Sequence, residues 1–267
     1  MSGKRRSGEQ SGREKRLAAG EDLLWGINPV FEALQEEPER IAELIVQKDK
    51  RGSRWDELIA QARSSGVKLS FVSSLRIEGG GQIRHQGIAA KMNTAAVMPF
   101  DQLLEKFKAL VEQGHWPRLM VCDSLQDPHN LGAIIRSAHA SGVQGVVITR
   151  ENSAPLGGTA AKSAAGALSH MDISQVTNLV TALEKLKEVG AWIFGAVKES
   201  GAQSVYETDF RLPACVVIGS EGKGIRPLVR KHCDVLVAIP MQGRLDSLNS
   251  SVAAGVILFE AMRQNMQ

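Results

Sequence analysis

Short apolar runs alternate with amphipathic segments along most of the second half of the chain. The apolar runs predict strands at 119–122, 145–149, 191–196, 214–219 and 235–239. Helical spacing of apolar residues predicts helices at 131–141, 159–168, 179–189 and 226–233. Near-continuous apolar strands that alternate with helices indicate a parallel sheet covered on both faces. Ligands bind such sheets at the carboxyl ends of the strands.

A similar but shorter α/β pattern covers residues 21–92, which we expect to form a small separate domain. Residues 93–117 are predicted to be a linker, in which Pro99 precedes an amphipathic helix at 100–112. The second domain should then occupy 118–267. The first twenty residues, rich in Gly, Ser, Lys and Arg, are expected to be a disordered basic leader.

The formal net charge of +3 is only weak evidence for nucleic-acid binding. Residues 1–16 carry six basic and two acidic side chains, so the rest of the chain is close to neutral. The leader can add a sequence-independent attraction to phosphate, or it can simply be a solvated tail. RNA binding by the folded part must therefore come from local surfaces.

Compartment and metal content follow from what the sequence lacks. No apolar run approaches the roughly 20 residues that a membrane span needs, and the basic N-terminus has no apolar signal core. We therefore expect a cytoplasmic protein. Cys122, Cys215 and Cys233 have no zinc or redox spacing, and the histidines are scattered, so we expect reduced thiols and no metal.

Polar clusters interrupt the apolar pattern in three loops after predicted strands, at 123–130, 219–224 and 241–249. In the third, Ser247 and Asn249 flank the apolar Leu248 just before a C-terminal helix whose apolar side we place at Val252, Val256, Phe259 and Met262. A helix N-cap would explain these polar residues, and a loop that wraps a small ligand is the alternative. The glycine-rich loop at 219–224 matches neither the phosphate-binding nor the dinucleotide-binding motif.

The first loop leads into a helix whose buried stripe is Leu131, Ile134, Ile135 and Ala138. Arg136 points off that stripe, and Asn130 stands at the helix start. One interpretation is a capping Asn with a solvated Arg. In the other, the guanidinium of Arg136 clamps an RNA phosphate or sugar with its rigid fork of donors, while Asn130 holds the neighbouring backbone or Glu221.

Taken together, these motifs resemble the SpoU-type RNA ribose 2′-O-methyltransferases. The resemblance runs from about Leu24 to Arg263 and rests on three motifs in order: Asp127-Pro-His-Asn-Leu-Gly with Arg136, Val217-Ile-Gly-Ser-Glu-Gly-Lys-Gly224, and Ile239-Pro-Met241 with Ser247-Leu-Asn249. In addition, Trp25-Gly-Ile-Asn-Pro29 and His85-Gln-Gly-Ile88 are similar to the N-terminal domain of the longer members, which is like ribosomal protein L30e.

This resemblance implies a trefoil-knotted α/β methyltransferase domain with a parallel sheet at 118–267 and an L30e-like RNA substrate-binding domain at 21–92. It also implies S-adenosylmethionine as cofactor and a homodimer through the knotted domains. Carried over residue by residue, the cofactor pocket should be lined by Gly219, Ile239 and Leu248, with backbone groups of Ala196, Val197 and Met241 nearby.

The family places Arg136 at the reacting hydroxyl, with Asn130, Glu221, Ser247 and Asn249 in support. Because a guanidinium keeps its proton, we expect Arg136 to orient the sugar and stabilise the developing alkoxide rather than to act as a base. A pure phosphate anchor is the alternative. For Glu221, a brace within the loop is as good an interpretation as a direct catalytic role.

The substrate implied by the resemblance is a guanosine ribose in the P-site loop of 23S rRNA. Another rRNA or tRNA site is the alternative within the same chemistry. Shorter family members that act on tRNA lack the N-terminal domain, which argues against tRNA. A third possibility is an rRNA-binding assembly factor without catalysis, although the intact set of five catalytic candidates argues against a decayed site.

Overall fold

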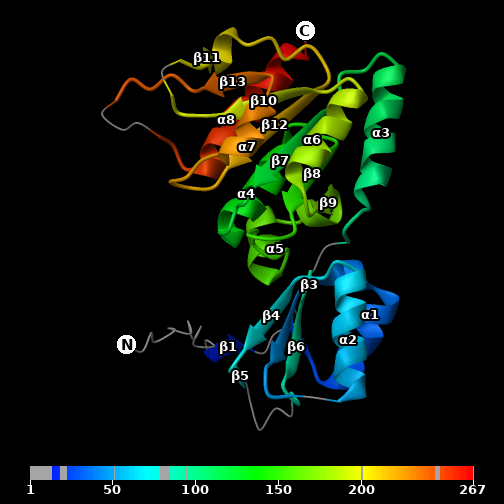
Figure 1. Ribbon diagram of the computed structural model, residues 1–267. Helices are drawn as coiled ribbons and strands as arrows, with labels where there is room; N and C mark the ends of the chain where they lie inside the picture. The colour runs from blue at the N-terminus through cyan, green and yellow to red at the C-terminus, as the bar shows by residue number, and fades with distance from the viewer. Residues whose placement is uncertain are drawn as a thin grey trace, which may run out of the picture. The chain divides into compact units, whose positions relative to one another are not determined.

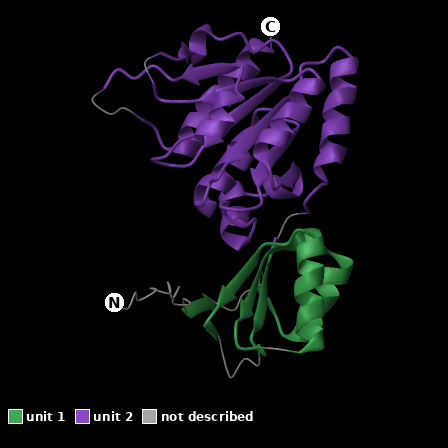
Figure 2. Ribbon diagram, viewed as in Figure 1, with its two compact units in different colours: residues 1–92 green, residues 93–267 purple. Residues whose placement is uncertain are grey.

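The computed structural model describes residues 14–18, 23–50, 52–78, 85–93, 96–199, 201–243 and 247–266. The chain divides into two compact units, residues 1–92 and 93–267 (Figures 1 and 2). No helix within the described ranges is long and apolar enough to cross a membrane.

Unit 1 is built on a mixed sheet in the order β2-β6-β3-β4. The strands are β2 (Leu23–Trp25), β3 (Ile41–Gln47), β4 (Leu69–Val72) and β6 (Ile88–Met92). Helices α1 (Ile27–Glu36) and α2 (Ser53–Ser64) cover one face, with the short η1 (Pro38–Arg40) between α1 and β3 (Figure 1). Trp55 lies in this core, where it is 7% exposed. Its apolar surface therefore stabilises the fold.

The opposite face of this sheet is covered by a parallel pair of strands, β1 (Glu14–Ala18) and β5 (Ser74–Glu78). Strand β1 falls inside the segment that the sequence predicted to be a disordered leader, so the structure differs from the prediction at residues 14–18. Leu17 is buried, and the Lys15 Nζ contacts Glu43 Oε1 at 2.8 Å. The packing of Leu17 and the ion pair of Lys15 both involve residues far away in the sequence. The composition of the leader could not predict them. Residues 1–13, 19 and 20 of the predicted leader lie outside the described residues.

Within the described residues, unit 2 contains a seven-stranded parallel sheet in the order β11-β13-β10-β12-β7-β8-β9. The strands are β7 (Arg118–Asp123), β8 (Gly145–Thr149), β9 (Asp172–Val176), β10 (Trp192–Ala196), β11 (Gln203–Ser204), β12 (Ala214–Gly219) and β13 (Val235–Ala238). The prediction of a parallel sheet is confirmed, and the trefoil knot stays a prediction. Strands β9 and β11 were not predicted, because both lie at sheet edges and carry polar residues.

Helices cover both faces of this sheet, as the alternating pattern predicted. One face carries α4 (Pro128–Ala140), α5 (Gly158–Ala164), η2 (Ala167–Ser169) and α8 (Ser250–Gln264). The other carries α3 (Phe100–Glu112), α6 (Leu179–Glu188) and α7 (Pro227–Lys231). A further short turn, η3 (Val205–Glu207), follows β11. Successive residues of β7 contribute alternately to the two cores, as the pleat of a strand requires.

Helix α3 had been predicted as part of a linker, with unit 2 beginning at residue 118. In the structure its Leu103 and Phe107 are each 1% exposed and pack against the same core as α6. Just before it, Met98 N donates to Ile173 O at 2.7 Å, which ties the approach to strand β9. The helix is therefore an integral layer of unit 2, and the division between the units lies near residue 93.

Helix α8 turns a different side inward from the one we predicted. Its buried apolar positions are Ala254, Ile257, Leu258 and Ala261. Val252 and Phe259, which we had placed on the inner side, are 50% and 43% exposed. The helix is apolar around much of its circumference, so spacing alone did not decide which side faces the sheet. An apolar strip is left uncovered in the isolated chain.

Candidate active site

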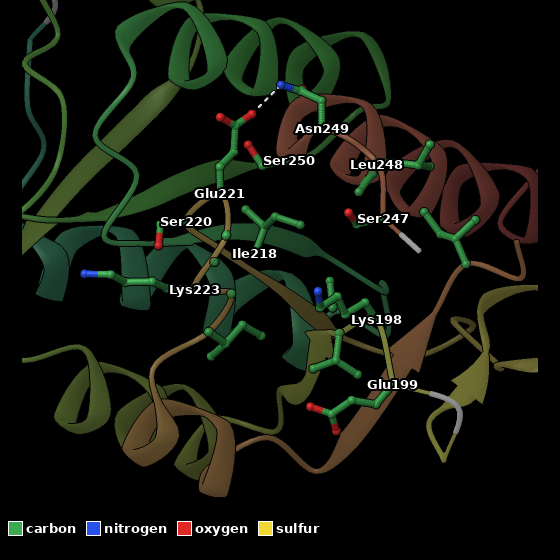
Figure 3. A pocket seen from close by; sticks show the side chains of 18 of the residues that line it. Lys198, Glu199, Ile218, Ser220, Glu221, Lys223, Ser247, Leu248, Asn249 and Ser250 are labelled. Carbon is green, nitrogen blue, oxygen red and sulfur yellow. Dashed lines mark hydrogen bonds between the residues drawn. The ribbon is translucent and has the colours of Figure 1, made fainter. Parts of the chain in front are cut away.

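A cavity of about 440 Å³ opens at the carboxyl ends of three neighbouring strands, β10, β12 and β13. Its walls are the ends of these strands, the loop 220–225, the segment 197–199 and the start of α8 (Figure 3). A cavity of this size suits a small organic ligand or cofactor. Its position at the carboxyl edge of a parallel sheet is the one the sequence predicted.

The structure brings the predicted cofactor-binding residues together around this cavity. All of them line it, although they come from loops far apart in the chain: Ala196, Val197, Gly219, Ile239, Met241 and Leu248. Glu221, Ser247 and Asn249 line the same cavity. The polar cluster around Leu248 is thus both the approach to a helix and one wall of a ligand-sized space.

The loop after β12 is folded so tightly that it excludes a side chain at Gly219. A Cβ there would lie 2.0 Å from the carbonyl carbon of Gly224, which is far inside van der Waals contact. Ser220 and Gly224 form a bridge, with Gly224 N donating to Ser220 O at 2.8 Å. A glycine is therefore required at position 219 by close backbone packing beside the cavity.

A buried carboxylate fixes the far end of the same loop. Asp123, at the end of β7, is fully buried and accepts hydrogen bonds from the N and Nε of Arg226 at 2.8 and 2.6 Å. Because the guanidinium supplies a positive charge, the buried carboxylate is both paired and hydrogen-bonded. Loop 220–225 is thus tied to the strand beside it.

Three polar side chains from different motifs meet at the other end of this loop. Asn130 Nδ2 donates to Glu221 Oε1 at 2.9 Å, and Asn249 Nδ2 donates to both Asn130 Oδ1, at 3.0 Å, and Glu221 Oε1. Figure 3 shows the bond between Glu221 and Asn249. The expected link between Asn130 and Glu221 is confirmed, and Glu221 has the geometry of a brace.

The capping interpretation of Asn249 is confirmed, whereas Asn130 is not a cap. Asn249 Oδ1 accepts from Ser251 N at 2.9 Å and Val252 N at 3.3 Å, so it caps α8 while its amide joins the cluster. The cap of α4 is Asp127, whose carboxylate accepts from His129 N at 3.0 Å. The side chain of Asn130 is thereby left to bind Glu221.

Arg136 is exposed on α4, off the buried stripe as predicted, and it does not line the cavity of its own chain. It follows Asn130 by six residues, which corresponds to roughly 9 Å along a helix. The next residue, Ser137, lies close to Gly255 of α8. A Cβ added to Gly255 would be 3.7 Å from Ser137 Oγ. The described chain alone therefore does not bring Arg136 to the other predicted catalytic residues.

Several cavity residues were not found from the sequence. A charged rim contains Lys198, Glu199, Lys223 and Arg230. Arg230 donates two hydrogen bonds to the carboxylate of Glu199, and this pairing holds the pKa of Glu199 below its usual range. The inner wall adds residues from strands and from α8: Ile218, Val237, Ser250, Ala253 and Ile257. Ile218 and Lys223 stand within the second motif but were not singled out, and the others belong to none of the three motifs.

The three cysteines are shielded from solvent to different degrees. Cys122 and Cys215 are buried and Cys233 is half-buried, and all three are free thiols. Burial raises the pKa of Cys122 to about 12 and that of Cys233 to about 11. Among the residues that the structure describes, no group of three or more His, Cys, Asp or Glu side chains could hold a metal ion.

Comparison with known proteins gives matches over both units. The model of the SpoU rRNA Methylase family matches residues 117–259, and a model described as RNA 2′-O ribose methyltransferase substrate binding matches residues 23–97. The chain is 40% identical over 243 residues to the 23S rRNA (guanosine-2′-O-)-methyltransferase RlmB of Xanthomonas campestris pv. campestris, covering 90% of this chain and 96% of that protein. The protein of the same name from Shewanella oneidensis is 39% identical over 91% of this chain and 98% of its own.

Solved structures show the same fold. An AdoMet-bound rRNA methyltransferase from Sinorhizobium meliloti superimposes with a TM-score of 0.56 at 21% identity, covering 90% of this chain and 86% of that one. The A. aeolicus TrmH/SpoU tRNA modifying enzyme gives 0.53 at 28% identity, over 62% of this chain and 84% of that one. Since the family model spans more than half of the chain and the relatives nearly all of it, the chain belongs to the SpoU rRNA methylase family.

Proposed function

We propose that this protein transfers a methyl group from S-adenosylmethionine to the ribose 2′-hydroxyl of a guanosine in the P-site loop of 23S rRNA. The observation that carries the proposal is the convergence of the six predicted cofactor residues on one cavity beside the cluster of Asn130, Glu221 and Asn249. The names of the relatives that match along most of the chain support the same reaction. Such an enzyme would act in the cytoplasm, where ribosomes are assembled.

The cavity has the chemistry that S-adenosylmethionine requires. Its inner wall is apolar, formed by side chains such as Ile218, Val237 and Ile257, and can accept the faces of an adenine ring. Its charged rim, which includes Arg230 and Glu199, suits the cofactor's amino-acid end. When bound, the cofactor supplies a methyl group already activated by a sulfonium, so the reaction needs no metal to assist the leaving group.

The protein's own task is to position the sugar and to stabilise charge. A ribose hydroxyl is a poor nucleophile, and holding it in line with the methyl group can supply a large share of the rate. The guanidinium of Arg136 would orient this hydroxyl and stabilise the alkoxide as it forms. The cluster of Glu221, Asn130 and Asn249 would keep the cavity loops in place.

A second copy of the chain would cover the exposed apolar strip of α8 and complete the site. Val252 and Phe259 stand on this strip, and α4, which carries Arg136, packs beside the same helix. Exposed apolar strips of this kind mark protein interfaces. A two-fold interface over α4 and α8 would allow Arg136 of one chain to serve the cavity of its partner, which accounts for its distance from the cavity of its own chain.

Replacing Phe259 with glutamate should convert the dimer into a monomer, because a carboxylate would be buried in an apolar interface. Light scattering coupled to size-exclusion chromatography measures the change. Leu228→Glu is the matched control, since Leu228 is 59% exposed on α7, which covers the other face of the sheet. A Phe259→Glu protein that remained dimeric, or a wild-type chain that was monomeric at micromolar concentration, would contradict the α8 interface.

We further propose that unit 1 grips structured RNA while unit 2 binds the cofactor and carries out the transfer. A chain that begins at Asn93 keeps α3, whose Leu103 and Phe107 belong to the core of unit 2. Starting at Trp116 instead would remove that helix and expose the core. The shortened protein should bind S-adenosylmethionine with unchanged affinity and methylate rRNA at least about 100-fold more slowly. Equal methylation without unit 1 would refute the division.

Transfer of a radiolabelled methyl group to 23S rRNA transcripts, followed by mapping of the modified nucleotide, tests the function as a whole. The expected product is a single 2′-O-methylguanosine in the P-site loop. Label at another rRNA site, or in tRNA, would keep the chemistry and change the substrate. Binding of rRNA with no transfer to free transcripts or to partly assembled particles would favour an assembly factor.

A further inference from the structure

Ser250, the first residue of α8, has a buried hydroxyl with no partner. The residue is 6% exposed and lines the cavity, yet its Oγ makes no hydrogen bond within the part of the chain that the structure describes. Buried hydroxyls are normally satisfied, because an unpaired one loses its bonds to water without replacement. Figure 3 draws Ser250 among the side chains around the cavity.

Other buried hydroxyls of unit 2 follow the normal rule. Ser174 Oγ donates to Met98 O at 2.8 Å, and Ser141 Oγ donates to Ala138 O at 3.1 Å. The nearby cap offers nothing to Ser250, because Asn249 Oδ1 is already occupied by the backbone N–H groups of Ser251 and Val252 and by Ser251 Oγ. Ser250 is therefore an exception that the local backbone does not explain.

The place of Ser250 on the helix indicates what it faces. Ser250, Ala253 and Ile257 are spaced by three and four residues, so they share one side of α8, and all three line the cavity. Ile218 and Val237 line the same cavity and pack in one apolar core with Ile257, so this side of α8 belongs to the apolar inner wall. When an aromatic ring packs its faces against the apolar residues of this wall, the hydroxyl of Ser250 lies at the edge of the ring, where the polar atoms of the ring are.

We propose that Ser250 Oγ hydrogen-bonds the edge of the adenine ring of S-adenosylmethionine and is a specificity contact for that ring. The inference rests on the proposed cofactor of this cavity. A hydroxyl can both donate and accept, so it can pair with a ring nitrogen or with the exocyclic amine. Because no protein group within the described residues pairs with this hydroxyl, it is available to a ligand that enters the cavity.

The test compares Ser250→Ala with Ser174→Ala by calorimetric titration and thermal unfolding. For Ser250→Ala, we expect affinity for S-adenosylmethionine, S-adenosylhomocysteine and 5′-methylthioadenosine to fall about three- to tenfold. The unfolding midpoint of its unliganded form should be unchanged or slightly higher. Ser174→Ala should lower that midpoint and leave all three affinities unchanged, because its hydroxyl is bonded within the protein.

Three results would overturn the inference. One is wild-type affinity in Ser250→Ala; another is a drop in its unliganded midpoint equal to that of Ser174→Ala, which would mean a bond within the protein. The third is an unchanged affinity for 5′-methylthioadenosine with a weakened one for S-adenosylmethionine, which would place the contact at the amino-acid end. A wild-type protein that bound none of the three compounds would instead sink the proposed function.

Discussion

Replacing Gly219 with alanine is expected to reduce S-adenosylmethionine binding by at least about 100-fold. The added Cβ would lie 2.0 Å from Gly224 C and 2.2 Å from Ile225 N, both backbone atoms that cannot rotate away. The loop that lines the cavity must open to relieve the clash. Overpacking of this kind typically costs about 1–3 kcal/mol and occasionally more, so the unfolding midpoint should fall as well. Calorimetric titration and differential scanning calorimetry measure the two effects.

The matched control for this substitution is Gly201→Ala. Gly201 is an exposed glycine in another loop of unit 2, and a Cβ there would meet nothing within 4 Å. We expect it to bind the cofactor as the wild type does. If Gly219→Ala bound S-adenosylmethionine normally, the loop would be free to rearrange, and its tight fold would not be what shapes the cavity.

Replacing Arg136 with lysine should lower the rate of methyl transfer by about 100-fold or more while cofactor affinity stays the same. Lysine keeps the charge but loses the planar fork of donors that can hold a sugar hydroxyl in one orientation. Loss of one preorganised donor to a developing oxyanion typically costs about 10²–10³ in kcat. Cofactor binding should be unaffected, because the proposed partner of Arg136 is the sugar hydroxyl of the RNA and not the cofactor.

Steady-state kinetics of rRNA methylation separate the two roles considered for Arg136. An orienting residue affects mainly kcat, whereas a phosphate anchor affects the KM for RNA and reduces the salt dependence of binding. Arg211→Lys is the control, since Arg211 is an exposed arginine of unit 2 that pairs locally with Asp209. Full turnover in Arg136→Lys would rule out the orienting role.

The hydrophobic pattern of the sequence was sufficient to predict the elements whose residue types are set by their burial. The apolar runs placed the central strands of unit 2 within a residue or two, because those strands are buried on both faces and must be apolar throughout. The motif residues around Gly219 and Leu248 were found in advance through their resemblance to the motifs of the SpoU family. Edge strands such as β9 were missed because one side of them tolerates polar residues.

The sequence by itself determined the parallel α/β architecture and the family's motif residues, because strand burial and tight loops restrict the residue type at each position. Only the tertiary structure decided which side of α8 faces the sheet, that β1 docks on unit 1, and that Asn130, Glu221 and Asn249 share one cluster. It also revealed Ser250 as a buried hydroxyl on the cavity wall. Each of these depends on contacts between segments far apart in the chain, and such contacts leave no periodic signal in the residues that make them.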